Sequence, residues 1–406
     1  MPSLLLRDLA QVVSPCGGRL PLRGAAALRD LTAVEDAYVL CRSGRITAVG
    51  RMRELGRLED DLVEIDGRGH AAVPGLVDCH THACFAGDRA AEFELRAAGA
   101  SYEELHAAGG GILATVRATR AAGATGLTQV VRRHRDWMRS QGTTTWEAKS
   151  GYGLDRDTEL AQLRAVREAG GIATWLGAHA VPPEFPEADT YLEFALAEVL
   201  PEAAKLAEAA DVFVERGAFD AAQARRYLEA CKEAGLVLRL HADQFTEGGG
   251  VGLAIELGAR SVDHLEATGP EGVQALAASD VAAVLLPVAA LTLGRPMPPA
   301  RDLIDSGAVV VLATDFNPGS AFCESLPLVM GLACTQLGMT PAEALAACTV
   351  NAAHVLGRTD RIGRIAVGYA ADVVVLEAPD WRYLAYHLGG DHVAAVIEDG
   401  KVVWER

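Results

Sequence analysis

The sequence lacks a long hydrophobic run, a secretory leader and paired cysteines. Its longest apolar stretch, VAAVLLPVAALTLG, is too short to span a bilayer and carries Pro287 in its middle. The first residues, MPSLLLRDLAQVV, have neither a basic segment nor a small-residue cleavage site, so they do not read as a signal peptide. The eight cysteines are scattered without a C-x-x-C pair, which favours reduced thiols. These features predict a cytoplasmic, soluble protein.

Basic residues are in deficit as well. The chain has 37 Lys and Arg against 54 Asp and Glu, a formal net charge of −17. This balance argues against nucleic acid and anionic membrane surfaces as partners, because both repel an acidic protein. An anionic substrate would therefore need a local cation in its binding site.

Hydrophobic residues, in contrast, are plentiful. They make up 50% of the 406 residues, enough for a large core, which argues against disorder. The length is long for one ordinary domain and suits a large α/β barrel with an appendage.

Both ends of the sequence show short alternating strand patterns. The segment IEDGKVV near the end places a D-G turn between apolar residues, which is typical of a hairpin. Neither end could bury much surface alone. We therefore expect residues 1–70 and 361–406 to form one composite β-sandwich domain.

Residues 71–360 alternate short apolar runs with helical patterns, which predicts βαβ units and a parallel sheet. Eight strands with intervening helices indicate a (β/α)8 TIM-like barrel. The strand candidates are AAVPGLVDCH, GTTTWEAKSG, GIATWLGAHA, ADVFVERG, LVLRLHAD, ARSVDHLEA, VAAVLLPV and AVVVLATDF.

Titratable residues end most of these strands. Catalytic groups of such barrels lie at the C-terminal ends of the strands, so this rim is the predicted functional face. We interpret Glu147 and Lys149 as an ion pair at the rim. The other strand-end residues are His80, His82, His179, Glu215, His241, His264 and Asp315.

The two histidines of VDCHTH can act together. Residues i and i+2 of a strand point to the same face, so His80 and His82 can reach one metal ion. His241 and Asp315 would complete a nitrogen and oxygen ligand set that suits Zn²⁺ or Fe²⁺. Any single histidine here could instead be an ordinary packed residue. The combination, with His264, favours a metal site.

These residues, in this order, resemble the amidohydrolase superfamily, whose members add a β-sandwich built from both chain ends. The resemblance implies that His80, His82, His241 and Asp315 are the metal ligands. Strand 4 ends in Glu215 rather than in the lysine of binuclear members, which implies one divalent ion per subunit.

The motifs GTTTWEAKSGYGL, GAHAVPPEF, LHADQF and TDFNPGS resemble a histidine-degrading branch of that superfamily. This closer resemblance implies a homodimer that hydrolyses the cyclic amide C–N bond of 4-imidazolone-5-propanoate to N-formimidoyl-L-glutamate. It implies substrate contacts at Arg89, Tyr102, Tyr152, His179, Gln244, Asn317, Gly319 and Ser320.

The chemistry of several of these residues agrees with that reaction. The substrate carries a carboxylate, which arginine binds in bidentate fashion, and Arg89 lies shortly after the histidine pair. The Tyr152 phenol could donate a hydrogen bond to a substrate oxygen. The amide of Gln244 cannot accept a proton as a base. Each of these residues also has an ordinary structural explanation. Arg89 could be a surface arginine, Tyr152 could be a packed tyrosine, and Asn317 and Gly319 could simply form a turn.

We expect the catalytic residues to be His264, Asp315 and His179. His264 would deprotonate or orient a metal-activated water, with Asp315 as the alternative base. His179 would stabilise the developing oxyanion or hold the substrate. One rival is a mononuclear-metal deaminase of nucleobases or other heterocycles in the same superfamily. A second rival is a non-catalytic scaffold, but scaffolds usually lose metal ligands, and all four are present.

Overall fold

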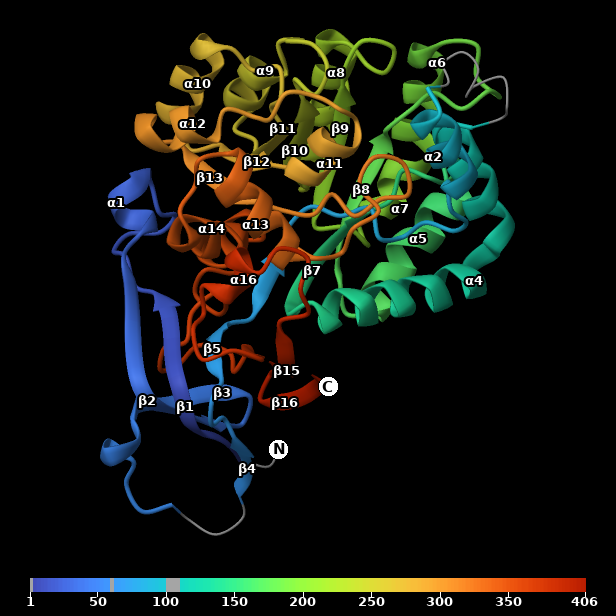
Figure 1. Cartoon of the computed structure of the whole chain (residues 1–406). Helices are drawn as coiled ribbons and strands as arrows, with labels where there is room; N and C mark the ends of the chain where they lie inside the picture. Colours follow the sequence, from blue (N-terminus) through green and yellow to red (C-terminus); the bar gives the residue numbers. More distant parts are fainter. Residues whose placement is uncertain (1–2, 59–61, 100–109) are drawn as a thin grey trace.

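The computed structural model of the chain describes residues 3–58, 62–99 and 110–406, which form a barrel and a smaller sheet (Figure 1). The barrel strands are parallel and neighbour one another in sequence order, and each of the eight predicted strands overlaps one of them. They are β6 (Leu76–Asp78), β7 (Thr143–Lys149), β8 (Ile172–Ala178), β9 (Ala209–Val214), β10 (Val237–Ala242), β11 (Ser261–His264), β12 (Ala282–Leu285) and β13 (Val309–Leu312). Of the predicted strand AAVPGLVDCH, only Leu76–Asp78 is in the barrel, because Ala71–Pro74 pairs in the smaller sheet.

The barrel is closed just beyond the ends of its first and last strands. The backbone N–H of Asp315 donates to the carbonyl of His80 at 3.0 Å, and that of His82 donates to the carbonyl of Phe316 at 3.0 Å. Thr81 and Phe316 form a parallel bridge at the same place. The segments after β6 and β13 therefore meet at the seam, which brings the histidine pair beside Asp315.

Helices connect the strands and cover the outside of the barrel (Figure 1). Asp155 and Asp220 cap two of them by accepting hydrogen bonds from backbone N–H groups of the first turn. The α-helices of the described residues are α1 (Gly24–Leu28), α2 (Ala90–Ala97), α4 (Ile112–Ser140), α5 (Arg156–Glu168), α6 (Ala188–Phe194), α7 (Leu200–Ala203), α8 (Ala221–Glu233), α9 (Gly250–Leu257), α10 (Pro270–Ala277), α11 (Pro287–Thr292), α12 (Ala300–Ser306), α13 (Leu326–Gln336), α14 (Pro341–Ala347), α15 (Val350–Val355) and α16 (Tyr383–Tyr386). A 3-10 turn spans Met52–Glu54, and a π-helical turn spans Ala195–Val199.

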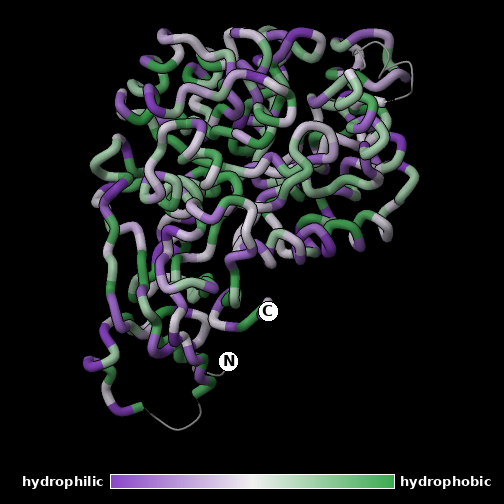
Figure 2. Tube along the Cα trace, in the orientation of Figure 1, coloured by the Kyte–Doolittle hydropathy of each residue, from purple (hydrophilic) through white to green (hydrophobic). Residues whose placement is uncertain are grey.

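The barrel strands are buried on both faces. Strands β12 and β13 consist of apolar residues only, AAVL and VVVL, and every one is buried. Hydrophobic stretches run through the interior, while the outer turns are largely hydrophilic (Figure 2). Against this apolar background, the buried charged residues of β7, β9, β10 and β11 are exceptions that need a chemical reason.

The two ends of the chain build a second sheet. Its strand order is β16-β15-β14-β5-β1-β2-β3, and β4, outside this order, pairs with the first residues of β1. Strand β5 joins the two ends because it is parallel to β1 and antiparallel to β14. The strands are β1 (Ser3–Pro15), β2 (Leu31–Arg42), β3 (Arg45–Arg51), β4 (Leu62–Asp66), β5 (Ala71–Pro74), β14 (Val373–Leu376), β15 (Val393–Glu398) and β16 (Lys401–Glu405).

This arrangement confirms the predicted fold class, a TIM-like barrel with a β unit made from both chain ends. Hydrogen bonds connect the strands of that unit into one continuous mixed sheet, which has its own apolar cluster around Leu6, Val39, Val373 and Ile397. All eight cysteines are free thiols. Among the described residues, we find no helix with the length and apolar character needed to cross a membrane.

Candidate active site

Five polar side chains converge at the C-terminal ends of β6, β10, β11 and β13. They are His80, His82, His241, His264 and Asp315, and each is at most 3% exposed. The Nε2 atoms of His80 and His82 both lie 3.4 Å from Asp315 Oδ1, and Nε2 of His82 lies 3.2 Å from Nε2 of His241. The structure thus brings together the four residues expected to bind a metal ion.

Two further carboxylates orient two of these histidines. His80 Nδ1 donates to Asp263 Oδ2 at 2.6 Å, and His241 Nδ1 donates to Asp211 Oδ1 at 2.9 Å. With protons on Nδ1, both rings present the lone pair of Nε2 to the centre of the cluster. Such lone pairs and a carboxylate oxygen repel one another unless a proton or a cation lies between them. The donor set therefore suits a metal cation.

The buried charges near the cluster also favour a cation. Carboxylates are in the majority among these charged groups, so a cation would offset negative charge that is buried there. Although burial opposes it, the neighbouring rings of His80, His82 and His264 hold the pKa of Asp315 well below its usual value. The carboxylates are Glu147, Asp211, Asp263 and Asp315, and the cations are Lys149 and Arg239.

His264 lies beside the ligand cluster, with its ring centroid 5.3 Å from that of His241 and 5.9 Å from that of His80. Its Nδ1 is 3.4 Å from Glu266 Oε1. The backbone is in the left-handed region at both His264 (φ 90°) and Leu265 (φ 73°). This conformation costs a non-glycine residue conformational free energy, and residues that adopt it cluster at functional sites.

The ring of His179 stacks on that of His82, with centroids 5.3 Å apart and an interplanar angle of 27°. Its Nδ1 donates to the carbonyl of Gly151 at 3.0 Å. Burial, together with the neighbouring His82 and His241, lowers the pKa of His179 well below its usual value. The ring is therefore neutral, and its Nε2 is a hydrogen-bond acceptor.

Tyr152 is buried against the same two rings, with centroid distances of 5.8 Å to His82 and 5.3 Å to His179. Burial raises the pKa of its phenol, so the hydroxyl keeps its proton. Tyr152 thus packs against the ligand cluster, beside His82 and His179.

Arg89 lies against the loop that follows β13. Its Nε donates to Glu92 Oε2 at 2.8 Å, and its Nη2 donates to Glu92 Oε1. The remaining Nη1 faces Gly319, where a β-carbon would overlap the guanidinium. Glu92 thus occupies the edge formed by Nε and Nη2, while Nη1 is packed against Gly319. The surface-arginine alternative is wrong, because the side chain is only 18% exposed.

Asn317 is engaged by its own loop. Its Nδ2 donates to the carbonyl of Asp315 at 2.7 Å and to Ser320 Oγ at 2.9 Å, and its Oδ1 accepts from the backbone N–H groups of Gly319 and Ser320. The amide therefore shapes the turn that carries Gly319 and Ser320. The Ser320 hydroxyl lies 3.5 Å from Asp315 Oδ2.

The other expected site residues are placed as follows. Gln244 is buried just after β10. Tyr102 lies outside the described residues. Glu215 accepts hydrogen bonds from the backbone N–H groups of Arg216, Phe245 and Thr246, so it orders the loop after β10.

Sequence reasoning missed the residues that support the site. Asp211 and Asp263 stand inside the apolar strands ADVFV and SVDH, and a charge in such a strand was an available signal. Glu92 gave no signal, because it lies on a helix with ordinary composition. Lys149 does pair with Glu147, at 2.9 Å, but both side chains are completely buried rather than at an exposed rim.

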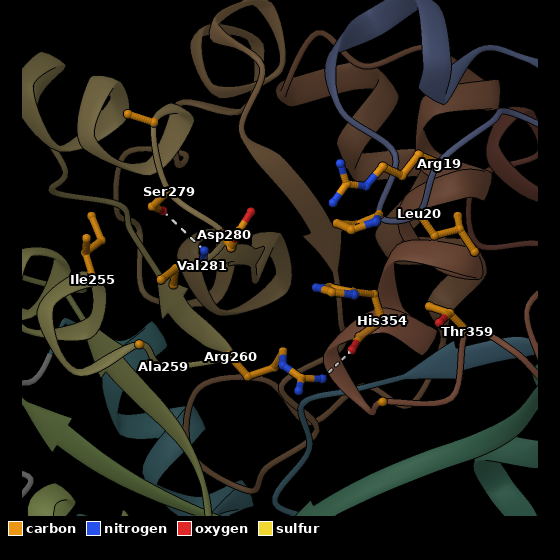
Figure 3. Close-up of a pocket in the computed structure, with 14 residues that line it drawn as sticks. Arg19, Leu20, Ile255, Ala259, Arg260, Ser279, Asp280, Val281, His354 and Thr359 are labelled. Carbon is orange, nitrogen blue, oxygen red and sulfur yellow. Dashed lines mark hydrogen bonds between the residues drawn. The ribbon is translucent and has the colours of Figure 1, made fainter.

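A separate cavity of about 840 Å³ lies at the opposite end of the strands (Figure 3). Two of its lining residues, Arg260 and Asp280, lie just before the first residues of β11 and β12. The cavity is therefore at the amino ends of the barrel strands. Arg260 Nη1 donates to the carbonyl of His354 there, at 2.9 Å. The candidate active site is the cluster at the carboxyl ends, where the ligand-type groups converge.

Comparison with known proteins agrees with this geometry. The amidohydrolase family profile matches residues 71–403. Escherichia coli guanine deaminase has the same fold, with a TM-score of 0.72 at 16% identity and full coverage of both chains. A triazine hydrolase variant gives a TM-score of 0.71 at 19% identity, covering 100% of this chain and 95% of the other. The chain belongs to the amidohydrolase family.

Within that family, the similarity to imidazolonepropionases extends over nearly the whole chain. The imidazolonepropionase of Rubrobacter xylanophilus is 61% identical over 407 aligned residues, with 98% of each chain covered. That of Chloroflexus aggregans is 48% identical, again with 98% of each chain covered. The deaminase named above shares the fold at far lower identity.

Proposed function

We propose that the chain has the activity for which those relatives are named, hydrolysis of the ring amide of 4-imidazolone-5-propanoate to N-formimidoyl-L-glutamate. The observation that carries the proposal is the convergence of four ligand-type groups near a largely buried arginine, in a chain 61% identical to an imidazolonepropionase. The cluster suits hydrolysis, and the arginine suits a carboxylate-bearing substrate.

One divalent ion, Zn²⁺ or Fe²⁺, is held in this proposal by His80, His82, His241 and Asp315. When bound, the ion supplies Lewis-acid activation of the water and of the substrate carbonyl. The orientation of His80 by Asp263 and of His241 by Asp211 supports this ligand set, because metal-binding histidines usually donate their second N–H to a carboxylate.

His264 moves the proton in the proposed reaction. A proton on Nδ1 is directed at Glu266 Oε1, which leaves Nε2 to accept a proton from the attacking water as its oxygen bonds to the ring carbonyl carbon. The same proton passes to the ring nitrogen when the C–N bond breaks. Asp315 is the alternative base, and the hydroxyl of Ser320 lies 3.5 Å from its second oxygen.

The remaining residues bind and orient the substrate. The neutral ring of His179 accepts a hydrogen bond from a substrate N–H. Its lowered pKa favours this role, because a cation that stabilises the oxyanion would have to carry a second ring proton. The Tyr152 phenol donates to a substrate oxygen. The Arg89 guanidinium binds the propanoate. Gln244, Asn317, Gly319 and Ser320 complete the proposed pocket, and the resemblance adds Tyr102, which lies outside the described residues, as a substrate contact.

Two wider features belong to the same proposal. The ligand is one small anionic heterocycle, with no nucleic acid or membrane as partner, in agreement with the net charge of −17. The protein is a cytoplasmic homodimer. The segment up to Pro74 and residues 361–406 form a domain distinct from the barrel, rather than residues 1–70 with 361–406, because β5 (Ala71–Pro74) pairs with β1 and β14. Light scattering of the purified protein tests the dimer.

The function is tested by incubating the protein with 4-imidazolone-5-propanoate and following the ultraviolet absorbance of the ring. We expect the absorbance to fall as N-formimidoyl-L-glutamate forms, and the reaction to stop after the metal is removed with a chelator and to resume on adding Zn²⁺ or Fe²⁺. Ammonia release from guanine or another amino-substituted ring, without opening of the imidazolone, would instead support the deaminase. A protein that binds no divalent ion would be a scaffold.

Gly319→Ala should weaken substrate binding. The new β-carbon would overlap the Arg89 guanidinium and displace it, so we expect KM to rise about tenfold, equivalent to about 1.4 kcal/mol, with kcat little changed. Steady-state kinetics measure both constants. Gly18→Ala is the control, because a β-carbon there meets no atom within 4 Å, and both Gly18 and Gly319 are loop glycines outside the left-handed region. An unchanged KM in Gly319→Ala would show that Arg89 does not need this close approach.

A further inference from the structure

Three charged side chains, Glu147, Lys149 and Arg239, form a buried group beneath the ligand cluster. Lys149 Nζ lies 2.9 Å from Glu147 Oε1, and Arg239 Nη1 lies 3.3 Å from the same oxygen. Glu147 and Lys149 are completely buried, and Arg239 is 2% exposed. The substrate contacts and proton transfers described above use none of the three.

One side of this group holds the backbone around His80. Glu147 Oε2 accepts from the backbone N–H of Thr81 at 3.1 Å, and the Thr81 hydroxyl donates to the carbonyl of Glu147 at 2.6 Å. Arg239 Nη1 donates to the carbonyl of Cys79 at 2.9 Å. The residues immediately before and after His80 are therefore both fixed by the group.

The other side of the group reaches His241. Lys149 Nζ lies 3.0 Å from Asp211 Oδ2, and the other oxygen of Asp211 accepts from His241 Nδ1 at 2.9 Å. A single ammonium group thus contacts both the carboxylate that fixes Thr81 and the carboxylate that orients His241. These two ligand segments are more than 150 residues apart in sequence, and Lys149 connects them through two contacts.

We propose that Lys149 is a positioning residue that holds the His80 and His82 segment at a fixed distance from His241, and so sets the affinity of the site for a divalent ion. The inference rests on the metal-dependent function proposed above. Groups that orient metal ligands commonly change affinity when they are replaced. A purely structural ion pair would affect folding without changing the affinity of the folded protein for metal.

The test compares Lys149→Met with the wild type and with Glu343→Gln. Glu343 is also completely buried and paired with arginines, Arg29 and Arg301, but it contacts none of the metal-binding residues. Dissociation constants for Zn²⁺ are measured by competition with a chromogenic chelator. The visible spectrum of the Co²⁺ form reports the ligand geometry. Thermal unfolding of the metal-free proteins reports stability.

We expect Lys149→Met to raise the dissociation constant about 10- to 100-fold and to alter the Co²⁺ spectrum. Glu343→Gln should change stability alone. Wild-type affinity and spectrum in folded Lys149→Met would overturn the inference and leave the proposed function standing. A wild-type protein that binds no divalent ion would overturn the function itself, so the two failures are distinguishable.

A double variant, Glu147→Gln with Lys149→Met, separates positioning from neutralisation of charge. It removes both charges of the pair, so no unpaired Glu147 carboxylate is left in the interior. It can therefore be measured even if the single variant does not fold. The glutamine still provides an acceptor for the backbone N–H of Thr81. We expect its metal affinity to stay low, because Asp211 still lacks its contact with Lys149. Recovery of wild-type affinity would mean that Lys149 only neutralises Glu147, and would overturn the inference.

Discussion

Replacing His264 with glutamine should lower kcat by about 100- to 10,000-fold, the usual contribution of a general acid–base group, while the divalent ion stays bound. His264 lies 3.4 Å from Glu266 through Nδ1, so its Nε2 is the nitrogen available for the proton of the attacking water. Glutamine keeps a polar side chain of similar reach but cannot take up a proton. The measurement is kcat together with metal content by elemental analysis.

The matched control for this variant is His354→Gln, a histidine at the far end of the barrel. We expect its kcat to stay near the wild-type value. Full turnover of His264→Gln with the ion intact would rule out His264 as the base and leave Asp315. Loss of the ion would show instead that His264 is a metal ligand, which its proximity to His80 and His241 permits.

Arg89→Met should lower kcat/KM for the propanoate substrate by about 100-fold or more, mainly through KM. Removing one partner of a buried ion pair costs about 2–5 kcal/mol, and each 1.4 kcal/mol is a factor of ten. Because Arg89→Met also leaves the Glu92 carboxylate unpaired, the variant should be measured together with Arg89→Met/Glu92→Gln. The two are expected to have the same weak substrate binding.

A neutral substrate provides the second control for Arg89. The propanamide analogue has the same ring but no carboxylate, so the wild type should prefer the propanoate strongly and the Arg89→Met variant should prefer it little. The measurement is the ratio of kcat/KM for the two substrates in each protein. An unchanged ratio in the variant would show that another group recognises the carboxylate.

The metal cluster was predictable because two simple periodicities determine it. Alternation along a strand places His80 and His82 on one face, and a parallel barrel brings the carboxyl ends of its strands to one rim. The same rule brings His241 and Asp315 to this rim, together with His179, Glu215 and His264. The resemblance to the amidohydrolase superfamily singles out His241 and Asp315 as ligands. Apolar runs were sufficient to locate the strands for this prediction, because only the position at which each strand ends has to be known.

The supporting residues could not be predicted in the same way. The contact of Asp263 with His80 joins residues 183 positions apart, and it depends on the side chain direction inside the barrel as well as on strand order. The pairing of Arg89 with Glu92 is local, but only the folded chain shows that it orients the guanidinium toward Gly319. Burial of Lys149 likewise depends on layers of side chains from several strands.

The small sheet at the chain ends has a consequence for biosynthesis. In that sheet Val73 pairs with Val374, so β5 obtains its partner β14 only after all eight barrel strands have been made. While the ribosome is still elongating the chain, this edge of β5 is open to pairing with another nascent chain. That edge stays open at least until β14 has been synthesised, so the length of the barrel between the two strands sets the minimum interval during which such pairing can happen.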